Sequence, residues 1–189
     1  LMDTARRKAL CGLGPSFRLR DLFGNWLELR GVNTVFLAAL EQKVAAAKRA
    51  GVPEDAVIVG DVFLRFAQLF KAYSMYCGMH DGATRRLSEL ACGKHGKAFS
   101  AWLARAAQDP RCAGQSLRSR LIMPIQRIPR YRLLLRELVR RTPRDHPDRV
   151  LCTKALAAVS GVAAHINEAL RAKERRLRVR EIGDRLRDG

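Results

Sequence analysis

The chain has 189 residues, 48% of them hydrophobic, which is enough apolar material for one folded domain with its own core and excludes a disordered polymer. Its 36 basic and 18 acidic residues give a net charge of +18, which raises nucleic acid and anionic lipid as candidate partners. The basic residues are mostly arginines spread along the chain, without the interleaved aromatic residues of a base-stacking platform. We therefore expect a solvated arginine-rich surface, with an anionic membrane surface as the alternative and nucleic acid as the least favoured partner.

The cysteines and the distribution of apolar residues bear on the compartment in which the protein works. No apolar run approaches the roughly 20 residues of a membrane span, and the first ten residues carry charges throughout, unlike a signal peptide. An odd number of irregularly spaced cysteines argues against a secreted disulfide framework: Cys11, Cys77, Cys92, Cys112 and Cys152. We expect a cytoplasmic protein, with a peripheral membrane location as the alternative.

The first predicted helix covers residues 21–44, with Asp21 as its N-cap. Helical spacing places one set of apolar side chains on its core face: Leu22, Trp26, Leu29, Phe36, Leu40 and Val44. The sequence Gly51-Val52-Pro53 predicts a break after this helix.

A second amphipathic segment covers residues 55–77, and its helical spacing continues as far as Leu90. Its broad apolar face contains Val59, Val62, Phe63, Phe66, Phe70, Tyr73 and Tyr76, followed by Ala83 and Leu87. Gly93 and Gly96 predict a loop. The next helix is anchored by Phe99, Trp102 and Leu103 and is expected to stop near Asp109-Pro110.

Residues 119–141 predict a helix with two patterned faces. One face is a continuous core stripe made of Leu121, Ile125, Ile128, Leu135 and Val139. Arg132 falls within this stripe, and we expect its aliphatic stem to pack while its guanidinium reaches water. Pro124 can start the helix in its first turn, whereas Pro129 removes a backbone hydrogen bond and is expected to bend it.

The second face of this helix mixes apolar residues with a fixed cation and an amide. It contains Ile122, Gln126, Pro129, Arg130, Leu133 and Glu137. That mixture is typical of a protein interface, where apolar area gives affinity and a few polar groups set orientation. A helix buried on nearly all sides would show the same pattern, so spacing alone leaves both interpretations open.

A turn is predicted over residues 142–147, followed by a last long helix over residues 148–182. Its inward face is expected to contain Leu151, Ala155, Val159, Val162, Ile166 and Leu170. The charged end of this helix is expected to project beyond the core. No strand-period alternation stands out, so the predicted fold class is all-α, a bundle of about six helices.

Residues 121–148, LIMPIQRIPRYRLLLRELVRRTPRDHPD, resemble the third conserved region of the Dbl-homology (DH) domain of Rho guanine nucleotide exchange factors. That region reads as a leucine-rich start, then P-[IV]-Q-R-[IV]-x-[RK]-Y-x-L-L-L-x-E-L, then Thr. Three further segments are similar to other parts of the family: LFGNWLEL at 22–29, GDVFLRFAQLFKAYSMYC at 60–77 and VAAHINEALRAKE at 162–174.

The resemblance implies an elongated helical bundle that binds a Rho-family small GTPase and needs no cofactor. Such an exchange factor performs no bond chemistry. It grips the two switch regions of the GTPase and stabilises the nucleotide-free form, so that GDP leaves and GTP enters by mass action. The alternative is a catalytically impaired DH-like domain that acts as a GTPase-binding or membrane-associated scaffold.

Carried over by position, the resemblance implies that Arg130 contacts switch 2 and that Asn167 contacts a switch region from the last helix. Gln126 and Ile122 match the same contacting face, and the region of Ile122 helps to choose among GTPases. Leu133 completes the predicted GTPase-binding set. Three residues are predicted to support it, namely Met123, Arg127 and Glu137, and Gln126 and Arg127 could equally be structural.

The first conserved region of the family carries a glutamate that contacts switch 1, followed by Tyr-Val. Residues before 20 contain neither glutamate nor tyrosine, so we expect residues 1–20 to be a divergent or truncated N-terminal segment. The DH domain is then expected over 21–175, with 176–189 as a charged extension of the last helix. Because the sequence begins with Leu1, we expect a segment of a longer protein.

Two Cys-x-x-His pairs invite a zinc interpretation: Cys77 with His80, and Cys92 with His95. Cys77 falls among aromatic core positions, and both pairs lack the context of a known zinc fold. We therefore predict no metal site, and no nucleophile–base pair or phosphate-binding loop is present to suggest catalysis.

Overall fold

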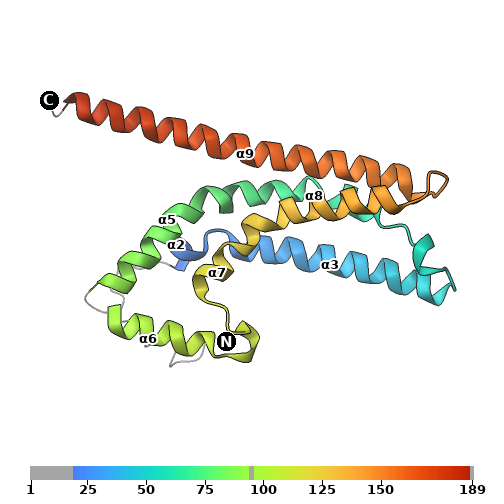
Figure 1. The fold of residues 1–189 in the computed structure, drawn as a ribbon, viewed down its shortest axis with the longest axis horizontal. Coiled ribbons are helices and arrows are strands. Elements are labelled where there is room, and N and C mark those ends of the chain that lie inside the picture. The colour runs from blue at the N-terminus through green and yellow to red at the C-terminus, as the bar shows by residue number, and fades with distance from the viewer. Residues whose placement is uncertain (1–18, 94–95, 188–189) are drawn as a thin grey trace. The chain divides into compact units, whose positions relative to one another are not determined.

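The structure is a computed structural model that describes residues 19–93 and 96–187, so the prediction for the N-terminal segment lies largely outside the described residues. Within those ranges the chain is helical and forms no strand, which confirms the all-α prediction (Figure 1). Its α-helices are α2 (Leu19–Phe23), α3 (Trp26–Arg49), α4 (Gly60–Phe66), α5 (Tyr73–Cys92), α6 (Gly96–Ala107), α7 (Leu117–Leu121), α8 (Met123–Arg141) and α9 (Asp148–Arg187). Three 3-10 turns connect them: η1 (Glu54–Ala56), η2 (Leu69–Ala72) and η3 (Pro110–Cys112).

The chain divides into two compact units. The first comprises Leu1–Asn25 and Met79–Pro124, and therefore contains α2, most of α5, α6 and α7. The second comprises Trp26–Gly78 and Ile125–Gly189, with α3, α4, the start of α5, nearly all of α8, and α9. Each unit has its own hydrophobic core.

The helix predicted over residues 21–44 is two helices, because Gly24 takes a left-handed backbone conformation with φ +55° between α2 and α3. Asp21 lies inside α2, so its prediction as an N-cap is wrong. Leu22, Leu29 and Phe36 are buried as predicted, and Leu40 packs against the core. Two further predictions are wrong, since Trp26 is 39% and Val44 is 50% exposed.

The segment predicted over residues 55–77 is divided into η1, α4, η2 and the start of α5. Its apolar face is nevertheless buried from Val62 to Tyr76, because short turns keep the aromatic side chains on one side. Val59 is only half-buried. The break at residues 51–53 is confirmed, with Gly51 at φ +67° closing α3.

Aromatic rings form the centre of the second unit. The Phe36 ring of α3 meets Phe63 and Phe66 of α4, Phe70 of η2 and Tyr131 of α8 edge to face, with ring centroids 5.0–5.5 Å apart. Offset and edge-to-face geometry is the favourable arrangement for aromatic pairs. Three helices are thereby joined around one ring, and α8 is held by its buried side.

A hydrogen-bonded chain satisfies the polar atoms in this core. The Asn33 amide donates to the Tyr73 hydroxyl at 2.7 Å, and the Tyr131 hydroxyl donates to the Asn33 Oδ1 at 3.2 Å. Burial raises the pKa of Tyr73 to about 12 and also raises the pKa of Tyr131. Both phenols are thus neutral donors or acceptors at ordinary pH, and the core buries no charge here.

A buried carboxylate fastens α4 to α9. Asp148, 2% exposed, accepts hydrogen bonds from the Val59 and Gly60 amides at 2.9 and 3.0 Å and from the Cys152 thiol at 3.1 Å. A Cβ on Gly60 would lie 2.6 Å from the Cys152 amide nitrogen and 2.7 Å from Leu151 backbone carbon, so only glycine fits this crossing. Burial, followed by the bond to Asp148, raises the pKa of Cys152 to about 12.

Helix α9 has two different halves. Ala155, Val159, Val162 and Ile166 are buried as predicted, while Leu151 and Leu170 are half-buried. The α9 helix contains an 18-residue window of mean hydropathy 1.3, long and apolar enough to cross a membrane by length and composition alone. This contradicts the expectation that no apolar run approaches the length of a membrane span, and 28% of the window is buried inside the structure.

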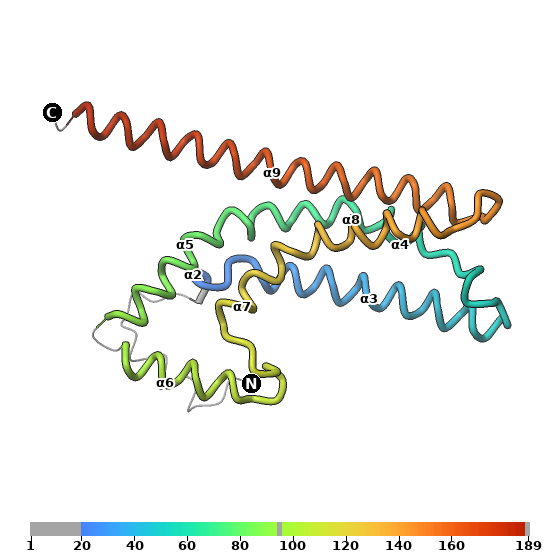
Figure 2. Tube along the Cα trace, in the orientation of Figure 1, coloured from blue at the N-terminus to red at the C-terminus, as the bar shows by residue number. Residues whose placement is uncertain are grey.

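The second half of α9 runs to Arg187, five residues beyond the predicted end. From Lys173 onward all of its residues are exposed except Gly183, so the expected projection beyond the core is confirmed. Figure 2 shows this half as the part of the α9 tube that leads to the C-terminus. The Lys173 ammonium donates to the Gly78 carbonyl within the same unit.

The first unit has a smaller core, made of Leu22, Leu87, Phe99 and Leu121. Phe99 stacks on Trp102 with centroids 6.1 Å apart, which confirms both as anchors of α6. Leu90 and Leu103 pack against this cluster. The α6 helix ends at Ala107, close to the predicted stop.

Candidate functional site: the solvent face of helix α8

The predicted helix over residues 119–141 is interrupted at Ile122, which ends α7 before α8 begins at Met123. The Ser116 hydroxyl accepts from the Ser119 amide at 3.1 Å and caps α7. Pro124 occupies the first turn of α8, where its missing N–H is not needed. Pro129 lies inside α8, and its predicted bend stays a prediction.

The core face of α8 is made by Ile128, Tyr131 and Leu135, which are 1%, 8% and 1% exposed. Ile125 and Val139 are half-buried on the same side. The placement of Arg132 in this stripe is wrong, because its side chain is exposed. Tyr131 takes that place, since the aromatic rings around Phe36 lie on its side of the helix.

The opposite face of α8 is open to solvent. Gln126, Pro129 and Arg130 are exposed, and Leu133 is 50% exposed. Among the described residues, the Gln126 and Arg130 side chains form no hydrogen bond or ion pair, and both are free to meet a partner. The alternative of a helix buried on nearly all sides is therefore wrong.

Sequence reasoning missed Leu134, which is 57% exposed beside Leu133. The sequence pattern assigned Leu134 to neither face of the helix, and its position next to Leu133 was the signal that could have placed it outside. With Leu133 it forms an exposed apolar pair on a helix that already has a core face. Exposed apolar residues that cluster beside fixed polar groups are typical of interaction surfaces.

Two of the predicted supporting residues are engaged inside the molecule. The Arg127 guanidinium lies 5.8 Å from the centroid of the Tyr131 ring, a cation–π contact that braces the core tyrosine. Glu137 is half-buried and pairs with Arg140 at 2.7 Å, and the hydrogen bond from Arg140 lowers the pKa of Glu137. The structure thus gives Arg127 and Glu137 positioning contacts within α8 rather than free side chains.

The remaining candidates lie elsewhere. Asn167 is exposed on α9, next to the buried Ile166 that anchors this turn of the helix. Within the described ranges, its amide takes part in no hydrogen bond. Ile122 is half-buried and Met123 is 38% exposed, and both belong to the first unit.

The Cys-x-x-His pairs do not come together as a metal centre in the described part of the chain, which contains no group of three or more candidate ligands. Cys77 is buried and its pKa is raised by that burial, which suits a structural thiol. Cys92 is exposed, and His95 lies outside the described residues.

Comparison with known proteins gives this geometry a family. The RhoGEF domain family matches residues 4–167. The chain is 37% identical over 161 residues to the phosphatidylinositol 3,4,5-trisphosphate-dependent Rac exchanger 1 protein of Mus musculus, covering 83% of this chain and 9% of that protein. It is 36% identical over 157 residues to the Rho guanine nucleotide exchange factor TIAM2 of Mus musculus, covering 79% and 9%.

Solved structures show the same helical fold. The DH/PH domains of p115-RhoGEF superpose with a TM-score of 0.76 at 25% identity, covering 96% of this chain and 52% of that one. An autoinhibited Dbl homology domain gives 0.68 at 27% identity, covering 87% and 74%. The DH/PH domains of PDZ-RhoGEF, solved in complex with activated RhoA, give 0.75 at 20% identity, which supports the fold alone.

The family match reaches into the N-terminal segment, so residues before 20 retain some family character, and their predicted divergence stays a prediction. The chain spans about a tenth of the length of the curated relatives that it matches. Because the match covers most of the chain and the relatives exceed 30% identity over four fifths of it, the chain belongs to the RhoGEF (Dbl-homology) domain family.

Proposed function

We propose that this chain promotes the release of GDP from a Rho-family small GTPase, with the solvent face of α8 and Asn167 of α9 as its binding surface. Membership of the RhoGEF domain family supports this activity. The observation that carries the proposal is that Gln126 and Arg130 are exposed and unengaged beside exposed leucines. The opposite side of the same helix is anchored in the core, so this surface is rigidly presented.

An exchange factor of this family is not an enzyme that makes or breaks covalent bonds. It accelerates exchange by binding the nucleotide-free GTPase more tightly than the GDP-bound form. By reciprocity, the affinity of the GTPase for GDP falls by the same factor while the exchange factor is bound. GTP then enters by mass action, and no cofactor of the exchange factor is required.

Each residue of the surface has a chemical role in this proposal. Arg130 supplies a fixed cation for a carboxylate or carbonyl in switch 2. Leu133 supplies apolar area, and the Asn167 amide can donate and accept at once. Gln126 orients the partner. Ile122 belongs to the first unit, and its part in the choice among GTPases stays a prediction from the family resemblance.

The test is the release of fluorescent GDP from a panel of Rho-family GTPases. Wild type is expected to accelerate release from at least one of them, and Arg130→Glu and Asn167→Ala are expected to slow that release. For Arg130→Glu we expect a loss of about tenfold or more, equivalent to ~1.4 kcal/mol. Arg132→Glu is the matched control, because it makes the same charge change two residues away, outside the proposed face.

If the full-length protein accelerates release from none of the GTPases, the exchange proposal is wrong. If Arg130→Glu is as active as wild type, the site is misassigned although exchange stands.

The second candidate is a domain that binds a GTPase without exchanging its nucleotide, which membership of the family also allows. Binding assays with nucleotide-free and GDP-loaded GTPase separate the two. Binding of both forms with equal affinity, without accelerated release, would support the second candidate. A protein that binds two states of a GTPase equally well does not shift the equilibrium between them.

We also propose that the exposed second half of α9 lies on an anionic membrane surface. Val179, Ile182 and Leu186 are 71%, 52% and 78% exposed and follow i, i+3, i+7 spacing on one face. Arginines flank this stripe, among them Arg175, Arg178 and Arg185. A basic amphipathic helix of this kind binds anionic lipid through apolar burial plus charge attraction.

Flotation with vesicles that contain phosphatidylserine tests this second surface, with phosphatidylcholine vesicles for comparison. Ile182→Asp is expected to abolish binding, whereas Leu177→Asp, on the opposite side of the helix, should retain most of it. Equal loss in the two variants, or equal binding to both vesicles, would contradict a lipid-facing stripe.

A further inference from the structure

Ser88 lies in a distinctive charge context in the first unit. It ends the sequence Arg85-Arg86-Leu87-Ser88, and no other serine or threonine of the chain has arginine at both the third and the second position before it. Thr142 has arginines one and two positions before it and a proline after it. Two arginines upstream of a hydroxyl form the charge pattern that arginine-directed protein kinases recognise.

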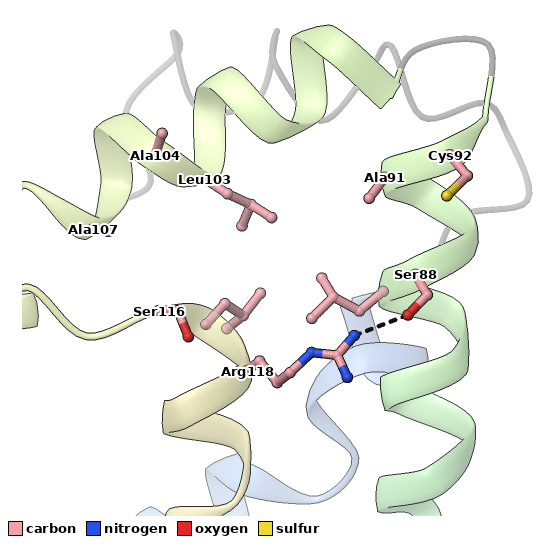
Figure 3. A pocket seen from close by; sticks show the side chains of 10 residues that line it. Ser88, Ala91, Cys92, Leu103, Ala104, Ala107, Ser116 and Arg118 are labelled. Atoms are coloured by element: carbon pink, nitrogen blue, oxygen red, sulfur yellow. Dashed lines mark hydrogen bonds between the residues drawn. The ribbon is translucent and has the colours of Figure 1, made fainter.

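The structure places a third arginine against the same hydroxyl. Ser88 is exposed on α5, where its hydroxyl donates to the Thr84 carbonyl at 3.2 Å. The Arg118 guanidinium, from α7, donates to the Ser88 oxygen at 2.9 Å, as the dashed line in Figure 3 shows. Among the described residues, Arg118 pairs with no carboxylate, so its charge is uncompensated.

The surroundings can accommodate a larger anionic group at this position. A cleft of about 490 Å³ opens beside Ser88 between α5, α6 and α7, lined mainly by apolar and small side chains such as Ala91 and Leu103 (Figure 3). The charged groups next to Ser88 are cationic apart from Glu89, and Glu89 is held by Arg86 at 3.0 Å.

We propose that Ser88 is a phosphorylation site for an arginine-directed serine/threonine kinase, and that Arg118 holds the resulting phosphoserine. In the transfer, the kinase's base takes the hydroxyl proton and Ser88 Oγ attacks the γ-phosphorus of ATP. The bond to the β-phosphate oxygen breaks, and ADP leaves. The hydrogen bond from the Arg118 guanidinium to a neutral hydroxyl thereby becomes an ion pair with a phosphate, which strengthens the tie between α5 and α7.

Ser88 lies near the end of α5, where local opening of the helix can give a kinase access to it. The helix ends at Cys92, one turn later, and the residues of that turn are exposed except for the half-buried Leu90. A kinase that binds its substrate in an extended conformation therefore needs the last turns of α5 to unfold locally. This opening takes the Leu87 side chain out of the core of the first unit. The folded chain should be modified more slowly than an isolated peptide.

The experiment treats the whole chain with the catalytic subunit of cyclic-AMP-dependent protein kinase and ATP, and locates the phosphate by mass spectrometry. We expect one phosphate on Ser88, none in Ser88→Ala, and a rate at least about tenfold lower in Arg85→Gln, which removes one upstream cation. Thr142 serves as the internal control and is expected to stay unmodified.

A second measurement tests the role of Arg118. The second pKa of phosphoserine, ordinarily about 6, can be followed by ³¹P NMR titration of the modified chain. Arg118 should lower this pKa, Arg118→Gln should return it towards its ordinary value, and Arg105→Gln on α6 should leave it unchanged.

These readouts do not depend on exchange activity, so they stand apart from the proposed function. A peptide covering residues 82–93 that is modified while the folded chain is not modified at Ser88 would overturn the modification site. A phosphoserine pKa that Arg118→Gln does not move would overturn the assignment of Arg118.

Discussion

Leu133, Leu134 and Leu135 are identical neighbours in the sequence and have opposite surroundings. Leu135 is 1% exposed in the core of the second unit, whereas Leu133 is 50% and Leu134 is 57% exposed. The difference comes from the helix alone, which turns by about 100° per residue. One turn of α8 therefore serves two purposes: its inner face holds the fold, and its outer face is available for a partner.

This contrast extends along α8. On the inner face, Tyr131 joins the rings around Phe36 and donates to Asn33. On the outer face, Gln126 and Arg130 have no partner in the described residues. Residues of the inner face should therefore affect stability, and residues of the outer face should affect binding of the GTPase with little change in stability.

The largest expected effect comes from the inner leucine. Leu135→Ala should lower the free energy of unfolding by about 3 kcal/mol, because it leaves a cavity in a close-packed core. Leu134→Ala, the same change at the next position outward, should alter it by less than about 0.5 kcal/mol. Urea unfolding followed by circular dichroism measures both, and equal effects would abolish the distinction between the faces.

The outer face should respond in a binding assay. Leu133→Ala is expected to weaken binding of nucleotide-free GTPase about tenfold, or ~1.4 kcal/mol, because apolar contact area is lost from the interface. The melting temperature should stay within the error of wild type. Isothermal titration calorimetry gives the affinity, and a variant that binds as wild type does would remove Leu133 from the proposed surface.

A smaller loss of stability is expected when the inner hydrogen-bonded chain is cut. Tyr131→Phe keeps the ring but removes the donor to Asn33 Oδ1, which should cost about 1 kcal/mol in the free energy of unfolding. Arg130→Ala, one position before it on the outer face, is the stability control. A Tyr131→Phe variant as stable as wild type would show that water replaces the hydroxyl.

A further effect on stability is expected from pH. All three tyrosines are buried, and burial raises the pKa of Tyr73 and Tyr76 to about 12. The folded state favours the neutral phenols. Their contribution to the free energy of unfolding is therefore fully present below their ordinary pKa of about 10 and is lost as pH rises from 10 towards 12. Urea midpoints measured between pH 8 and 11 should fall above pH 10, and less steeply in Tyr73→Phe. A flat profile would mean that these phenols titrate normally.

The helical period carried most of the information about the fold. It located the aromatic face from Val62 to Tyr76, the inward side of α9 and the core stripe of α8, because apolar side chains at helical spacing must leave water together. It failed at Arg132 and Trp26. Helical spacing shows on which side of a helix a side chain lies, but it does not show whether a neighbouring helix packs against that side chain. It also missed the breaks at Gly24 and Ile122, where local backbone conformation decides.

The candidate site was partly predictable for the same reason. The second face of α8 was visible in the sequence as a mixture of apolar, amide and cationic residues, and its motif resembled a known family. Spacing could not distinguish an exposed face from a fully buried helix. It also could not show the cation–π contact between Arg127 and Tyr131 or the ion pair between Glu137 and Arg140, because both contacts depend on side-chain conformation.

The sequence by itself therefore determined the all-α class, the composition of the core and the family, since these follow from periodicity and from a dense local motif. Only the tertiary structure decided that the second face of α8 is open to solvent and that Leu134 is exposed beside Leu133. It alone revealed that Asp148 fastens α4 to α9 through Gly60, 88 residues away in the chain. Such contacts join residues that no local pattern relates, because they form only once distant helices have packed.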